Sequence, residues 1–169
     1  MNGSLKNGKN VCLSLQMVSA IVQLAKTDPV SYNSSNVKKK EKYMQLIRDS
    51  FDNVYNGKVP KYRNGCELYG QVCFFTSEGT DLDADNISKP VWDALEGLVY
   101  DNDKQIVMRK SSVIYKAKHE LIALDGYSDR AADLLQIIMK KSVKCIYIEC
   151  GHFKESMIEM DLEELYEDR

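Results

Sequence analysis

The stretch 81-DLDADNISKPVWDALEGLVYDNDKQI-106 places one short helix between two groups of aspartates. Its apolar residues recur at the spacing of a single helix face. Strand-like apolar runs lie on both sides of it, so the stretch predicts the centre of a strand–helix–strand unit. The apolar stripe consists of Ile87, Val91, Ala94, Leu95 and Leu98.

The run before this stretch, Cys66–Thr76, is apolar on both of its alternating faces, which is typical of a central strand. Further strands are expected at 11–24, 105–116 and 143–149, and helices at 37–55 and 128–138. Asn56-Gly57 should end the first of these helices, and Ser34, Ser35 or Asn36 should cap its start. This order predicts an α+β (mixed α/β) fold, with one mixed sheet flanked by helices.

The length of 169 residues and the 44% apolar content favour one domain with a substantial core. That domain should span 1–169, with a loose start at 1–10 and an acidic tail at 152–169. The tail holds seven acids and two bases, so the other residues carry 21 bases and 18 acids despite the overall net charge of −2. The body is thus mildly basic, and nucleic acid stays open as a partner.

Two other classes are disfavoured by the sequence. No apolar run approaches the roughly 20 residues that a membrane span requires, and the interrupted run 11–24 precedes no clear cleavage site, so we expect a cytoplasmic protein. The five cysteines form no C-x-x-C pair, which favours reduced, mostly buried thiols over a zinc site.

The aspartates themselves suggest a cation site. Asp83 and Asp85 are two positions apart and would point to the same side of an extended strand end. Asp101 or Asp103 could supply a third carboxylate if the two strand ends come together. Carboxylates in this number suit a hard cation such as Mg²⁺. Helix capping and turn formation would explain some of these aspartates, but not all of them together.

An EF-hand is excluded by two positions. The calcium loop requires glycine at its sixth position and glutamate at its twelfth, where this chain has Asn86 and Trp92. Asp81 is the first aspartate of that D-x-D-x-D pattern, and we regard it as peripheral to the expected cation site.

The same stretch resembles the core of the RusA-type Holliday junction resolvases. Their pattern is roughly D-x-D-N-x-x-K, followed by D-A-L-(N/T)-G and an acidic turn that ends in D-(D/E/K)-Q. The matching residues here are Asp83, Asp85, Asn86, Lys89, Asp93-Ala94-Leu95-Glu96-Gly97 and Asp103-Lys104-Gln105. The family's basic, proline-rich turn after the first strand would fall on 27-TDPVSYNSSN-36, which lacks lysine and arginine.

The resemblance implies a homodimeric crossover junction endodeoxyribonuclease, a hydrolase of bacterial or prophage origin that acts in DNA recombination and repair. It implies that Asp83, Asp85 and Asp103 bind Mg²⁺, with Mn²⁺ as a substitute, and that Lys89 is catalytic beside them. Its substrate would be branched DNA, a four-way junction. A related nuclease for flaps, forks or replication intermediates, or a non-catalytic junction-binding protein, remains an alternative.

Two further expectations concern cations. We place Lys89 in the first turn of its helix, where the helix dipole disfavours a cation. This unfavourable position requires a compensating role, which is either catalysis or an ion pair with Asp85 or Asp93. Basic side chains elsewhere should contact phosphates, or else form a solvated surface. They are Lys38, Lys39, Lys40, Lys42, Lys58, Lys61, Arg63, Arg109, Lys110, Lys116, Lys118, Lys140, Lys141 and Lys144.

Overall fold

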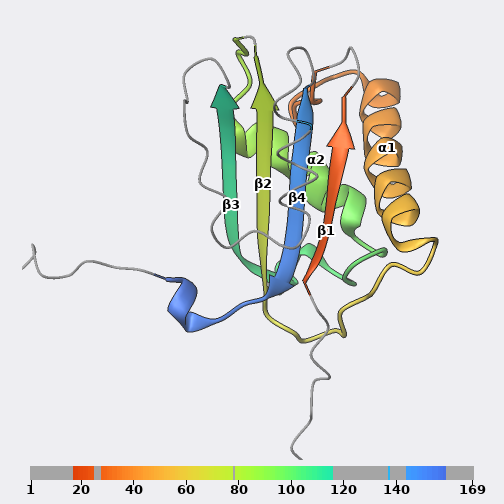
Figure 1. The fold of residues 1–169 in the computed structure, drawn as a ribbon, viewed down its shortest axis with the longest axis vertical. Coiled ribbons are helices and arrows are strands. Elements are labelled where there is room, and N and C mark those ends of the chain that lie inside the picture. The colour runs from red at the N-terminus through yellow and green to blue at the C-terminus, as the bar shows by residue number, and fades with distance from the viewer. Residues whose placement is uncertain (1–16, 25–27, 78, 116–136, 138–143, 159–169) are drawn as a thin grey trace, which may run out of the picture.

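The computed structural model describes residues 17–24, 28–77, 79–115, 137 and 144–158. Four strands form one mixed sheet in the order β1-β4-β2-β3 (Figure 1). The strands are β1 (Val18–Gln23), β2 (Leu68–Thr76), β3 (Ile106–Tyr115) and β4 (Cys145–His152). The helices are α1 (Val37–Tyr55) and α2 (Ala84–Leu95), with short 3₁₀ turns η1 (Asp103–Gln105) and η3 (Glu155–Met157).

β2 is an interior strand, as its two apolar faces predict. It pairs in parallel with β3, from Leu68↔Ile106 to Thr76↔Tyr115, and antiparallel with β4. The parallel pair is joined through α2, so the quoted stretch is the crossover of a β2–α2–β3 unit. The α+β fold with a mixed sheet is confirmed.

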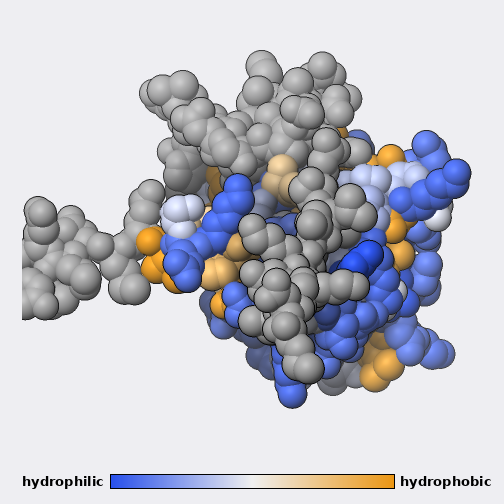
Figure 2. All heavy atoms as spheres, turned by 90° about the horizontal axis from the view of Figure 1, so that it is seen from below, coloured by the Kyte–Doolittle hydropathy of each residue, from blue (hydrophilic) through white to orange (hydrophobic). Residues whose placement is uncertain are grey.

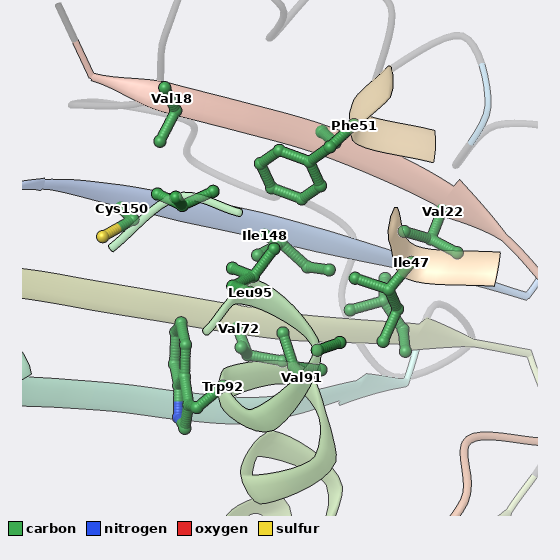
Figure 3. Packing of buried hydrophobic residues seen from close by; sticks show 14 of the residues in the cluster. Val18, Val22, Ile47, Phe51, Val72, Val91, Trp92, Leu95, Ile148 and Cys150 are labelled. Carbon is green, nitrogen blue, oxygen red and sulfur yellow. The ribbon is translucent and has the colours of Figure 1, made fainter. Parts of the chain in front are cut away.

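Both described helices cover the same face of the sheet (Figure 1). Phe51 and Ile47 of α1 and Val91 and Leu95 of α2 point into one core with Val72 of β2 (Figure 3). Each of these side chains is buried. Burying a side chain of this size contributes about 1.5–3 kcal/mol, so this shared core fixes α2 on the sheet.

The other face of the sheet carries a smaller apolar cluster and one buried acid. Cys73, Phe75, Cys145 and Tyr147 form the cluster. Glu149 is 2% exposed, and its carboxylate accepts hydrogen bonds from the hydroxyls of Tyr69 (2.6 Å) and Tyr147. These bonds compensate for part of the cost of burying a polar side chain.

Element boundaries differ slightly from those expected. α1 has Asn36 as its N-cap and Asn56 as its left-handed C-cap, as predicted. β3 starts at Ile106 because Gln105 belongs to η1, and β4 extends to His152, so the first residue of the expected acidic tail is part of the sheet. Of the predicted helix at 128–138, the structure describes only Ile137, which is helical, and the segment 1–10 and the tail beyond Ile158 lie outside the described residues.

Of the four cysteines that the structure describes, Cys73, Cys145 and Cys150 are buried and Cys66 is half-buried, which agrees with the expectation of mostly buried side chains. Within the described ranges, no helix is long and apolar enough to cross a membrane. The coloured surface visible in Figure 2 is mostly hydrophilic, with hydrophobic residues in separate small patches.

Candidate active site

The N-terminal end of α2 carries two aspartates that the helix does not use for capping. Asp83 is the N-cap residue, yet its carboxylate accepts no hydrogen bond from the helix backbone. Within the described residues, the one hydrogen bond of this carboxylate is a 3.3 Å contact from the side-chain amide of Asn86. Asp85 lies in the first turn, and its side chain makes no hydrogen bond or ion pair within the described part of the chain. Helix capping therefore does not account for either carboxylate.

Pro90 explains how the loop before α1 is attached to α2. A proline has no N–H, so the carbonyl four residues earlier loses its helical partner. That carbonyl belongs to Asn86, and it accepts the backbone N–H of Tyr32 at 2.9 Å. The side-chain amide of Asn33 also donates to the side-chain oxygen of Asn86 at 3.2 Å. The loop is thus hydrogen-bonded to the first turn of α2.

Gln105 holds the turn that carries Asp103. Its buried side-chain oxygen accepts the backbone N–H groups of Asp101 (3.0 Å) and Asn102 (3.2 Å). Its amide donates to the carbonyl of Arg63 at 2.9 Å. The side chain of Asn102 in turn accepts the N–H of Lys104. This capping box fixes η1 and therefore the position of Asp103.

Asp103 is linked to α2 and to β3 by two cations. Lys89 Nζ lies 2.6 Å from Asp93 Oδ1 and 3.2 Å from Asp103 Oδ2. Arg109 Nη2 lies 3.2 Å from the same Asp103 oxygen and donates to the Asp103 carbonyl at 2.9 Å. All four side chains are partly exposed. They form a continuous network, Asp93–Lys89–Asp103–Arg109, at the surface between α2 and β3.

The charges of this network reinforce one another. The hydrogen bond to Asp93 raises the pKa of Lys89, partial burial opposes this, and the bond to Asp103 adds to it. Burial raises the pKa of Asp103, but the hydrogen bonds from Lys89 and Arg109 outweigh it and leave the pKa below its usual value. Lys89 is therefore a stable cation near neutral pH, suited to holding an anion and unsuited to acting as a base.

A pocket of about 590 Å³ lies where the loop, α2 and β3 meet. Asp85, Asn86 and Lys89 line it from α2, Arg109 and Ser111 from β3, and Tyr32 from the loop. Trp92 also lines it, and its buried indole N–H has no hydrogen-bond partner in the described chain. The pocket therefore brings an unpaired carboxylate and two cations to one opening.

Half of the chain matches a model of a known protein family, Endodeoxyribonuclease RusA, over residues 37–122. The chain belongs to the RusA endodeoxyribonuclease family. The matched range contains α1, the β2–α2–β3 unit and every residue of the Asp93–Lys89–Asp103–Arg109 network. A comparison with curated proteins found no match.

The RusA-type metal ligands expected from the sequence do not gather into one cluster. Among the residues that the structure describes, no three carboxylate, imidazole or thiol side chains lie close enough together to hold a metal ion. β2 and β3 are parallel, so the end of β2 and the start of β3 lie at opposite ends of the pair, and the expected meeting of strand ends does not occur. Asp103 reaches α2 through Lys89 instead.

The donor chemistry nevertheless suits a hard cation. Asp83 and Asp85 offer carboxylate oxygens that no cationic side chain of the described chain neutralises. Asp103 differs, because its carboxylate is already bound by Lys89 and Arg109. A metal ion would therefore displace no cationic partner from Asp83 or Asp85, whereas it would have to displace one from Asp103.

One expectation for Lys89 is wrong. α2 begins at Ala84 and continues through Pro90, so Lys89 lies in the second turn, where the dipole of the helix start no longer opposes it. Of the two ion pairs considered for it, the one with Asp93 is present. Its additional contact with Asp103 ties it to the turn that carries another candidate residue of this RusA-family site.

Sequence reasoning counted Arg109 only among phosphate contacts and did not single out Tyr32 or Trp92. The proximity of Arg109 to Lys89 depends on the parallel register of β3, and that of Tyr32 on the loop bond to Asn86, and no local pattern encodes either. Trp92 follows Lys89 by three residues on α2, so helical spacing alone places it nearby. Several of the expected DNA-contacting cations have protein partners: Lys61 pairs with Asp101 and Lys144 with Asp28, both within 2.7 Å. Lys116, Lys118, Lys140 and Lys141 lie outside the described residues.

Proposed function

We propose that this protein is a structure-selective endodeoxyribonuclease that resolves four-way DNA junctions by paired, Mg²⁺-dependent phosphodiester hydrolysis in recombination and repair. The observation that supports this most strongly is the Asp93–Lys89–Asp103–Arg109 network beside the unpaired Asp85, inside the segment that matches the RusA family. Mn²⁺ would be an acceptable substitute for Mg²⁺.

Asp83 and Asp85 would hold the metal ion, with Asp103 as the third carboxylate. The bound ion would neutralise the phosphate, lower the pKa of a water molecule and stabilise the leaving oxygen. Asp85 lines the pocket, and the Asp83 carboxylate is not engaged in capping the helix, which is consistent with such a role.

Lys89 and Arg109 would act on the phosphate directly. Both line the pocket, and both carry fixed positive charge near the unpaired carboxylate of Asp85. Charged donors aimed at the reacting phosphate stabilise the negative charge that grows on it in the transition state. A carboxylate partner on each cation fixes its position before DNA arrives.

DNA binding would rest on further phosphate contacts. Lys38, Lys39 and Lys42 near the start of α1 and Lys58 and Arg63 before β2 are exposed. Such contacts make binding depend on salt and carry no base sequence, which suits recognition of junction shape. A homodimer would provide the two active sites that paired nicks in a nearly two-fold junction require.

The test is to compare three synthetic DNA substrates with equal end labels: a four-way junction, a 5′ flap and a linear duplex. The expected result is Mg²⁺-dependent nicking that strongly prefers the junction. Preference for the flap would favour a replication-intermediate nuclease instead. Junction binding without nicking in Mg²⁺ or Mn²⁺ would favour a non-catalytic binding protein and would contradict the proposal.

A further inference from the structure

Tyr32 is an aromatic side chain that the fold leaves exposed at the edge of the pocket. It is 48% exposed, and its hydroxyl makes no hydrogen bond within the described residues. It lies outside the part of the chain that matches the RusA family. Nearly half of this residue is therefore accessible, at the same pocket as Asp85 and Lys89.

The backbone of Tyr32 is held firmly although its ring is exposed. Its N–H donates to the Asn86 carbonyl that Pro90 leaves free, at 2.9 Å. Its own carbonyl accepts the ammonium group of Lys40, from α1, at 2.8 Å. These two bonds join the loop to both helices, so the ring is presented at the pocket with little further loss of entropy on binding.

Lys40 also orients the ring itself. Its Nζ lies 5.2 Å from the ring centroid, within the range of a cation–π contact. It lies over one face of the ring, so a planar ligand would stack on the other. The loop 27–36 contains no lysine or arginine, so it cannot form an ion pair with a DNA phosphate.

We infer that Tyr32 stacks on an unpaired nucleobase next to the scissile phosphate, an inference that rests on the proposed function. Every base offers a π-face, and stacking on an aromatic side chain needs no particular base sequence. Bases at a branch point or an opened strand are the ones available for this contact.

The experiment combines a side-chain change with removal of a base. Binding of junctions is measured with Ca²⁺ in place of Mg²⁺, using Tyr32→Ala, Tyr32→Phe and the unmodified protein. Single abasic sites are placed in turn at each nucleotide that adjoins the branch. Tyr32→Ala should weaken binding to the intact junction by about 5- to 150-fold, which is the size of one base–aromatic stack. Tyr32→Phe should bind almost normally.

The abasic series identifies the stack. At one position, removing the base should weaken junction binding by the unmodified protein by the same factor as the Tyr32→Ala change. Removing that base should not weaken binding by the Tyr32→Ala variant any further. Leu46→Ala, which trims an exposed apolar side chain of α1 away from the pocket, should change neither measurement.

Three results would overturn the inference. The first is that Tyr32→Ala binds the intact junction as tightly as the unmodified protein. The second is that every abasic site weakens binding by Tyr32→Ala as much as it weakens binding by the unmodified protein. The third is that Tyr32→Phe binds as weakly as Tyr32→Ala. In each case junction binding and nicking by the unmodified protein would still stand, so the proposed function would survive. Failure of the unmodified protein to bind branched DNA would overturn both.

Discussion

Lys89 owes its position to two carboxylates from different elements. Asp93 holds it from one turn further along α2, and Asp103 holds it from η1. Both contacts are at a partly exposed surface, where an ion pair is worth only about 0–1 kcal/mol. The network is therefore a weak contributor to stability, and its value lies in positioning an ammonium group beside the pocket.

Lys89→Ala should lower the single-turnover rate of junction nicking by about a hundredfold or more, the scale of losing one group that stabilises transition-state charge. Junction affinity should change little, as should the melting temperature. Nicking at saturating protein and thermal unfolding monitored by circular dichroism test this. Lys104→Ala removes an exposed lysine next to Asp103 and is the matched control. Nicking by Lys89→Ala at the unmodified rate would exclude a catalytic role.

Gly70 allows Trp92 to pack against β2. A Cβ added at Gly70 would lie 2.6 Å from Cη2 and 2.9 Å from Cζ3 of the fully buried indole. Gly70→Ala should therefore lower the free energy of unfolding by about 1–3 kcal/mol, as overpacking typically does. Urea denaturation measures this. Gly79→Ala has open space around its new methyl group and should change stability far less. Equal stability of the two variants would contradict the packing described here.

At the scale of elements, the start of α1 depends on a single cap. Asn36 Oδ1 accepts the N–H of Lys39 at 2.9 Å, and the first turn holds no acidic residue that could offset its positive end. Asn36→Ala should cost about 1 kcal/mol of unfolding free energy. Asn53→Ala, at an exposed position inside the same helix, should be neutral or slightly stabilising, because alanine is the better helix former. Similar losses in both variants would argue against capping.

The sequence predicts a helix or strand well where its apolar residues recur with the period of that element. Both faces of β2 are apolar, and the structure gives it a neighbour on each side. The caps of α1 are local signals and are also recovered. The start of α2 was misjudged because Pro90 suggests a helix boundary, whereas the Asn86 carbonyl finds a partner in Tyr32 and the helix continues.

The candidate site is predictable only in part. Asp83, Asp85, Lys89 and Asp103 stand out by their spacing, and the structure joins Lys89 to Asp103 and places Asp85 in the same pocket as Lys89. The contribution of Arg109 depends on how β3 is aligned beside α2, and that of Tyr32 on a bond between residues 54 positions apart (86 − 32). Such contacts arise from tertiary packing and leave no periodic trace in the chain.

At the scale of the whole molecule, the proposal requires two active sites for two nicks. A homodimer would supply them by symmetry. Sedimentation velocity at micromolar concentration should therefore show a dimer, both with and without a four-way junction. A fully active monomer would contradict this part of the account, and it would predict nicks that occur independently rather than in pairs.

The central claim is that the molecule cuts DNA with the carboxylates at the start of α2. The most direct measurement is single-turnover nicking of a four-way junction in Mg²⁺ by Asp85→Asn, with Asp81→Asn as the control. Both variants remove one negative charge from an exposed aspartate of the same stretch. The account predicts that Asp85→Asn binds the junction but loses at least a hundredfold in rate, while Asp81→Asn nicks almost normally. Equal rates for the two variants would contradict it.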